Sequence, residues 1–266
     1  MAAVYISAAM KTTPRLHLDP RLGAGLEIAL TEPQSHYLRN VLRLSPGDPV
    51  RAFNGHDGEW LCYLADGGKR QARLRCERPT AAAAPPPDID YLFAPLKHAR
   101  LDYVVQKATE LGARRLRPVI TTRTIAQRVN LERMRANAIE AAEQCGVLSI
   151  PDIAEPMTFG RMLGARNPDR LLVFCDEDAE VKDPVTALSD ARPKPEAALQ
   201  VSAQNASQPI AVLIGPEGGF SDEERAALFQ QPNIVRLSLG PRILRADTAA
   251  VAALALVQAV LGDWKA

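Results

Sequence analysis

Hydrophobic and polar positions follow two different patterns along this chain, and the pattern changes near residue 80. Before that point, short apolar runs end at turn signals: Pro49–Phe53 precedes Asn54-Gly55, Glu59–Leu64 precedes Asp66-Gly67-Gly68, and Gln71–Cys76 follows. This spacing is typical of a small β-barrel or β-sandwich. Between the turns, Gln34–Leu44 predicts a short helix that carries Arg39 and Arg43 one turn apart.

After residue 88, strand-like runs alternate with stretches of helical spacing, which predicts an α/β fold with a mostly parallel sheet covered on both faces. A helix beginning at Ser221 is marked by a capping box, because Glu224 stands three residues after the N-cap. Residues 178–208 show little periodicity and predict a loose connection. We expect strands over Ile89–Pro95, Arg117–Ile120, Arg170–Phe174, Ile210–Ile214 and Ile234–Leu239, and further helices over Arg100–Gly112, Asn130 to about Cys145, and Asp247–Leu261.

A proline-rich segment, Thr80–Pro87, separates the two patterns and predicts a stiff linker. We therefore expect a first domain over residues 1–79, a linker over 80–87 and a second domain over 88–266. No apolar run reaches the ~18 residues of a membrane span. Met1–Met10 has no basic segment before an apolar stretch, so we expect no secretory signal and a cytoplasmic protein.

Composition narrows the class of protein. Hydrophobic residues make up 47% and charged residues 24% of 266, which excludes a disordered chain, a collagen and a coiled coil. The four cysteines and four histidines are scattered and lack the spacing of metal ligands. We expect reduced thiols and no metal site.

The formal net charge of +1 hides a strong segregation of charge. Residues 97–135 contain 10 Lys and Arg against 3 Asp and Glu, whereas residues 136–210 contain 6 against 12. Arginine dominates the basic stretch, and its planar fork suits phosphate oxygens and nucleic-acid bases. The segregation predicts an anionic partner on one side of the molecule, or alternatively a solvated helix face.

Unusual residues follow three of the predicted strands: 175–177 after Phe174, 215–220 after Ile214 and 240–248 after Leu239. Ligands of open α/β sheets gather beyond the carboxyl ends of strands. Gly215–Gly219 has the spacing of neither a dinucleotide fingerprint nor a phosphate loop. Its glutamate would repel a polyphosphate but tolerate a zwitterion or a nucleoside. The alternative is a strand-to-helix turn with a structural glutamate.

Five segments resemble, in order, the RsmE family of SPOUT RNA methyltransferases. They are His36–Asp48 (HYLRNVLRLSPGD), Gln106–Gly112 (QKATELG), Glu140–Gly146 (EAAEQCG), Leu213–Ser221 (LIGPEGGFS) and Leu239–Ala249 (LGPRILRADTA). The resemblance implies methylation of N3 of a specific uridine in 16S rRNA, within the small ribosomal subunit, with S-adenosyl-L-methionine as donor and S-adenosylhomocysteine as product. It also implies a homodimer, an N-terminal PUA-like β-barrel that binds RNA, and a SPOUT-type parallel sheet with a C-terminal trefoil knot.

The resemblance assigns site residues as well. A uridine N3 must lose its proton before it attacks, so Glu217 is the candidate proton acceptor and Arg245 the candidate stabiliser of negative charge on the base. No metal is expected, because a sulfonium is already activated. The expected cofactor-binding residues are Leu213, Ile214, Gly215, Gly218, Gly219, Leu239, Gly240, Leu244 and Cys175, and the expected RNA-binding residues are Arg39, Arg43, Arg123 and Arg242.

Several alternatives stay open. Glu217 could pair with a helix N-terminus, and Arg245 could contact a phosphate. The enzyme could act on transfer RNA or 23S rRNA, or the chain could be a non-catalytic RNA-binding assembly factor. Two departures from the family pattern are Val147 in place of an arginine and Ala246-Asp247 in place of Thr-Glu. Gly215→Val is expected to abolish cofactor binding by filling space that the ligand needs.

Overall fold

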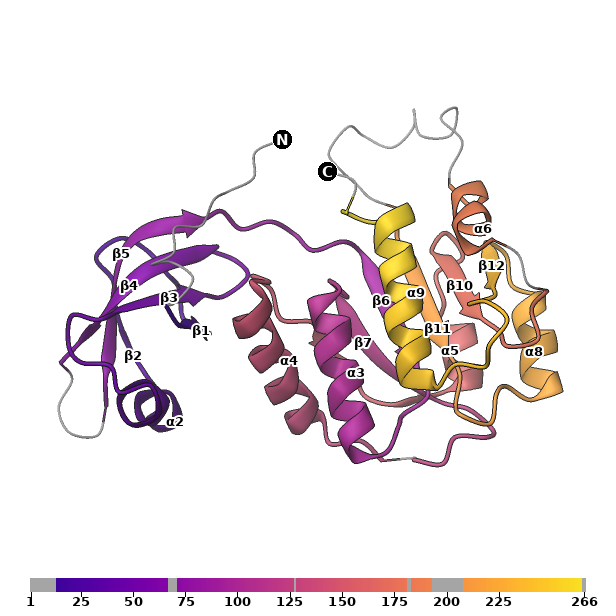
Figure 1. The fold of residues 1–266 in the computed structure, drawn as a ribbon, viewed down its shortest axis with the longest axis horizontal. Helices are drawn as coiled ribbons and strands as arrows, with labels where there is room; N and C mark the ends of the chain where they lie inside the picture. Colours follow the sequence, from indigo (N-terminus) through magenta and orange to yellow (C-terminus); the bar gives the residue numbers. More distant parts are fainter. Residues whose placement is uncertain (1–12, 67–70, 127, 181–182, 193–207, 265–266) are drawn as a thin grey trace. The chain divides into compact units, whose positions relative to one another are not determined.

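The structure is a computed structural model that describes residues 13–66, 71–126, 128–180, 183–192 and 208–264. The chain divides into two compact units (Figure 1): Met1–Pro85 with Ala142–Ile150, and Pro86–Ala141 with Pro151–Ala266. The predictions for the start of the chain and for the turn at Gly67-Gly68 lie outside the described residues, as does the part of the 178–208 connection over 193–207. Within the described part, no helix is long and apolar enough to cross a membrane.

The first unit contains a curled five-stranded sheet with strand order β1-β3-β4-β5-β2. The three apolar runs predicted as strands are confirmed as β3, β4 and β5. Cys62 and Leu74, on neighbouring strands, pack with Leu16 and Val50 into one buried core. The strands are β1 (Arg15–His17), β2 (Glu27–Ala29), β3 (Pro49–Phe53), β4 (Glu59–Ala65) and β5 (Arg73–Ala81).

The predicted helix over residues 34–44 is shorter and differently wound. Helix α2 covers Glu32–His36 and continues as the π-helix η1 over Tyr37–Val41. Arg43 lies beyond its end with φ of 58°, in the left-handed region. The expectation that Arg39 and Arg43 stand one turn apart on a single helix is therefore wrong.

The second unit confirms the predicted parallel sheet. Its strand order is β12-β10-β11-β6-β7-β8, with β9 beside β7. Every pairing among these strands is parallel. The strands are β6 (Ile89–Phe93), β7 (Arg115–Ile120), β8 (Asp152–Ile153), β9 (Met157–Thr158), β10 (Leu171–Cys175), β11 (Ile210–Ile214) and β12 (Ile234–Leu237).

The central strands of this sheet are buried on both sides, because helices cover both faces. One face packs Leu213 and Phe174 against α5 and α8. Helices α3 and α9 lie side by side over the other face (Figure 1). The helices are α3 (His98–Glu110), α4 (Leu131–Cys145), α5 (Phe159–Gly164), α6 (Pro184–Asp190), α8 (Asp222–Phe229) and α9 (Ala246–Val260).

Capping explains one confirmed helix start and one that the sequence analysis missed. At α8, Glu224 N–H donates to the Ser221 hydroxyl at 3.3 Å, and Ser221 N–H donates to the Glu224 carboxylate at 3.0 Å. Helix α6 lies inside the predicted loose connection, so that expectation is wrong over Pro184–Asp190. Asp183 caps α6 by accepting from two backbone N–H groups, and a proline follows at the first helical position.

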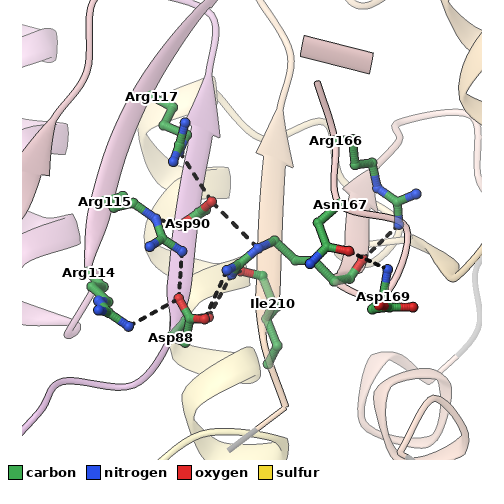
Figure 2. A network of polar contacts seen from close by, with 10 residues as sticks. Asp88, Asp90, Arg114, Arg115, Arg117, Arg166, Asn167, Asp169 and Ile210 are labelled. Carbon is green, nitrogen blue, oxygen red and sulfur yellow. Dashed lines mark hydrogen bonds and ion pairs between the residues drawn. The ribbon is translucent and has the colours of Figure 1, made fainter. Parts of the chain in front are cut away.

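A polar network occupies the edge of the sheet where the strands begin (Figure 2). Asp90, on the buried strand β6, contacts Arg115 and lies 3.2 Å from Arg117 Nε. Asp88 accepts from Arg115 at 2.6 Å and from Arg170 at 2.9 Å. Three arginines of the basic stretch thus pair with carboxylates of this network: Arg115 and Arg117 with the buried Asp90, and the more exposed Arg114 with Asp88.

Candidate functional site

Three loops meet at the opposite edge of the sheet. Strands β12, β10 and β11 are neighbours and parallel, so their carboxyl ends bring residues 175–177, 215–220 and 238–245 together. The loops and the start of α9 enclose a cavity of about 510 Å³. This volume lies within the ordinary range of small-molecule sites.

Most of the residues expected to bind a cofactor line this cavity, and so do three of those expected to bind RNA or to take part in catalysis. Leu213 and Gly218 are absent from the described lining. The Leu213 side chain is fully buried in the core, whereas the Gly218 carbonyl accepts a hydrogen bond from Arg123 at 2.9 Å. The predicted residues in the lining are Cys175, Ile214, Gly215, Glu217, Gly219, Leu239, Gly240, Arg242, Leu244 and Arg245.

Two glycines of the loop after β11, residues 215–220, are required by close contacts with neighbouring side chains. A Cβ added to Gly215 would stand 2.5 Å from the buried ring of Phe220. The expectation that Gly215→Val acts by filling ligand space therefore needs correction, since the added side chain would first collide with this ring. Gly219 has φ of +68°, and a Cβ there would collide with the Glu177 carboxylate.

An ion-pair cluster anchors the loop that follows β10. The fully buried carboxylate of Asp176 forms ion pairs with Arg225 of α8 and with Arg236 of β12, both at 2.6 Å. A buried carboxylate with two such partners holds its loop rigidly. Burial and the neighbouring Asp176 carboxylate raise the pKa of Cys175 to about 12, so this cavity-lining thiol stays protonated at neutral pH.

A second ion pair, between Arg100 and Glu217, also lines the cavity. The guanidinium of Arg100, from α3, contacts the Glu217 carboxylate, and Arg100 Nε lies 3.9 Å from Asp247 Oδ2. The side chains of Arg100 and Glu217 are 40% and 47% exposed, so both can reach a ligand in the cavity. Asp247 is the shorter carboxylate that departs from the family pattern, and here it lies near this arginine.

The predicted RNA-binding arginines fall into two groups. Arg123 and Arg242 belong to the second unit, where Arg123 holds the Gly218 carbonyl and Arg242 lines the cavity. Arg39 and Arg43 belong to the first unit, and Arg39 lies 3.7 Å from Asp66. The described residues contain no cluster of three or more His, Cys, Asp or Glu that could hold a metal ion.

Sequence reasoning missed several lining residues. In the sequence, Arg100 stands out only as part of the basic stretch. In the structure it lies in the first turn of α3, the helix that follows β6, and this position brings it to the carboxyl edge of the sheet. Its proximity to the strand end was the available signal. Phe220 and Ala249 lie inside two of the five resembling segments but were not expected as site residues, and Arg225 lies outside those segments. The placement of all three depends on how α8 and α9 pack.

Comparison with known proteins agrees with this arrangement. An RNA methyltransferase domain model matches residues 84–258, and an RNA methyltransferase PUA domain model matches residues 30–76. Ribosomal RNA small subunit methyltransferase E of Rickettsia conorii is 31% identical over 92% of this chain and 94% of its own. The protein of the same name from Synechocystis is 32% identical over 93% of this chain and 78% of its own.

Two solved structures are similar over nearly their whole length. Ribosomal RNA small subunit methyltransferase E from Neisseria gonorrhoeae, bound to S-adenosyl methionine, superposes with a TM-score of 0.78 at 25% identity, covering 95% of this chain and 99% of that one. A Legionella pneumophila methyltransferase in complex with S-adenosyl methionine gives a TM-score of 0.75 at 28% identity, covering 93% and 97%.

The parallel sheet, the loops at its carboxyl edge and the PUA domain define a SPOUT-type RNA methyltransferase. The expected fold class is thereby confirmed, while the trefoil knot stays a prediction. Within that class, the chain belongs to the ribosomal RNA small subunit methyltransferase E family.

Proposed function

We propose that this protein methylates N3 of a uridine in 16S rRNA, within the small ribosomal subunit, using S-adenosyl-L-methionine. The observation that carries the proposal is the cavity at the carboxyl edge of the sheet, where two glycine-bearing loops meet the Glu217 carboxylate and the guanidinium groups of Arg100 and Arg245. Relatives of the same family provide the substrate class by name. Because the proposed substrate is ribosomal RNA, we place the reaction in the cytoplasm, and we include the homodimer in the proposal.

The cavity fits S-adenosyl-L-methionine in size and in chemistry. Backbone groups of Gly215, Gly219 and Gly240 and the apolar side chains of Leu239 and Leu244 suit an adenosine. The carboxylates of Glu177 and Glu217 suit its cationic groups. When bound, the cofactor supplies an electrophilic methyl group: the N3–carbon bond forms as the carbon–sulfur bond breaks, and sulfur keeps the electron pair.

The protein has two tasks in such a reaction. The Glu217 carboxylate is half exposed at the border of the cavity, and it would take the proton from N3. Arg245 is exposed and lines the same cavity, where its guanidinium would stabilise negative charge on a uracil oxygen. These roles require the uridine to leave its base pair and its stack, because N3 lies on the Watson–Crick edge.

The decisive experiment maps methylated uridines. Small ribosomal subunits from a bacterium lacking the corresponding gene are incubated with the protein and isotopically labelled S-adenosyl-L-methionine, and the 16S rRNA is analysed by mass spectrometry. We expect one labelled uridine, with the methyl group on N3. Label on a ribose or another base, or in 23S rRNA alone, would contradict the proposed specificity. No label together with no cofactor binding would indicate a non-catalytic assembly factor.

A first prediction concerns Arg43, which is exposed in the first unit. Arg43→Ala is expected to weaken binding to small-subunit RNA and to lower the slope of log affinity against log salt by about 1, the value for one lost phosphate contact. The affinity for S-adenosyl-L-methionine is expected to stay unchanged. Filter binding over a range of salt concentrations measures the first quantity and calorimetry the second. An unchanged salt slope would remove Arg43 from the RNA-binding surface.

A further inference from the structure

A second cavity adjoins the one assigned to the cofactor. It has a volume of about 430 Å³ and lies between the loop after β6, the start of α3 and the segment after β7. We call it the base cavity. Its lining is mainly apolar, with Pro95, Leu96, Ala99, Ile125, Ala126 and Pro216. Pockets that hold a nucleobase outside its helix pair such apolar walls with a few polar groups.

Among the described residues, the polar side chains that line the base cavity are Lys97, Arg100 and Glu217. Arg100 and Glu217 also line the cofactor cavity, and their ion pair therefore stands on the border between the two spaces. The Arg100 side chain makes its contacts at this border with two carboxylates, Glu217 and Asp247. A group bound in the base cavity would thus meet a donor and an acceptor where it faces the cofactor.

This polar set complements the edge of one pyrimidine. The Watson–Crick edge of uracil presents two carbonyl oxygens on either side of the N3–H donor, which calls for donor, acceptor and donor in the protein. Lys97 and Arg100 are donors only, and the Glu217 carboxylate is an acceptor only. Cytosine presents a lone pair at N3, which an ionised Glu217 would repel.

We propose that the base cavity receives the target uracil and that Arg100 is the positioning residue, donating to a uracil carbonyl oxygen and holding Glu217 against N3. The proposal rests on the function proposed above and adds the place of the substrate and the basis of its selection. As N3 gives its proton to Glu217, negative charge spreads to the ring oxygens, where the Arg100 guanidinium stabilises it from the base cavity and Arg245 from the cofactor cavity. The loop that joins the two cavities, Gly215–Glu217, lets both ligands meet at one edge of the sheet.

The first test blocks the base cavity alone. Ala99 lines the base cavity but is absent from the described lining of the cofactor cavity, and it is exposed on α3. Ala99→Trp is expected to lower kcat/KM for unmethylated small subunits at least ~100-fold while the cofactor Kd stays within about twofold. Ala136→Trp, at an exposed position of α4, is the matched control and is expected to retain full activity.

The second test separates positioning from structural support. With S-adenosylhomocysteine at saturation, the wild-type protein is expected to bind subunits with uridine at the methylated position more tightly than subunits with cytidine there. Arg100→Ala is expected to lose this preference and to retain its affinity for the cytidine form. In methyl transfer, Arg100→Ala is expected to lose about 10²–10³ in kcat, with Arg100→Lys recovering part of it. The ratio of wild-type to Arg100→Ala rates is expected to shrink as pH rises and solvent removes the N3 proton.

The outcomes distinguish the two proposals. If the wild-type protein methylates no uridine, the proposed function fails. If the wild-type protein and Ala99→Trp methylate equally well, only the base cavity is refuted. If Arg100→Ala keeps the preference for uridine, or if its deficit is the same at every pH, Arg100 has no positioning role. Cofactor affinity and thermal unfolding of each variant show that it is folded.

Discussion

Replacing Ala249 with leucine is expected to lower the affinity for S-adenosyl-L-methionine at least ~100-fold, equivalent to about 2.7 kcal/mol. Ala249 lies near the start of α9 and lines the cofactor cavity. Leucine is nearly as good a helix former as alanine, so the helix is retained while three added carbons enter the space that the ligand needs. Isothermal titration calorimetry of the purified variant measures the loss.

A control on the same helix makes this experiment specific. Ala259 is exposed on α9, and Ala259→Leu is expected to bind the cofactor with wild-type affinity. Gly215→Val is a poorer choice, because its side chain would collide with Phe220 and disturb the loop itself. Wild-type affinity in the folded Ala249→Leu protein would mean that the cofactor binds elsewhere.

The largest expected effect on stability comes from Asp90. Asp90→Ala removes a buried carboxylate that pairs with Arg115, Arg117 and Arg170. Arg115 and Arg170 keep Asp88 as a partner, whereas the ion pair of Arg117 with Asp90 is lost. Breaking a buried ion pair from one side costs about 3–5 kcal/mol. The melting temperature of the second unit is expected to fall by about 10 °C in differential scanning calorimetry.

A surface ion pair in the same unit provides the control for the loss of stability in Asp90→Ala. Glu110 pairs with Lys107 on the surface of α3, and Glu110→Ala is expected to change the free energy of unfolding by at most ~0.5 kcal/mol. Equal melting temperatures for the two variants would show that the network in Figure 2 contributes nothing beyond surface pairing.

The same network predicts how stability depends on pH. Burial by itself would raise the pKa of Asp88, but the hydrogen bond and charge of Arg170, together with Arg115 and Arg114, outweigh it and hold the pKa below its ordinary value. A carboxyl group whose pKa is lowered by folding stabilises the folded state at pH values above its unfolded-state pKa of about 3.9. The difference in stability between wild type and Asp88→Asn is therefore expected to be constant above pH ~5 and to shrink as the pH falls through the folded-state pKa.

Much of the second unit could be predicted because each element carries its own local signal. The run Ile210–Ile214 is apolar throughout, as a parallel strand buried on both faces requires, and the observed strand has the same bounds. Ser221 and Glu224 fixed the start of α8 through a capping box. Positions of this kind depend on neighbours within a few residues, which a sequence displays directly.

What could not be predicted depends on contacts between distant residues. Asp90 lies within a buried strand, and a carboxylate is tolerated there because it pairs with Arg115 of the adjacent strand β7 and with Arg170, which comes just before β10. The basic stretch predicts a surface for an anionic partner, but two of its arginines, Arg115 and Arg117, pair with the buried carboxylate of Asp90. Likewise, the sequence predicts that a side chain at Gly215 would enter the ligand space, whereas in the structure it would meet the ring of Phe220, five residues later.

The division of the chain has a consequence for its synthesis. Residues 142–150 complete the first unit: Arg15 donates to the carbonyls of Ala142, Glu143 and Val147, and Arg15 also pairs with the buried Glu59 at 2.7 Å. A growing polypeptide can close this unit only after the ribosome has passed Ile150, when part of the second unit has already emerged. A single cut at the proline-rich junction would therefore yield an N-terminal fragment without the carbonyl groups that its buried Arg15 guanidinium contacts, and the hydrogen-exchange protection of this fragment is expected to fall accordingly.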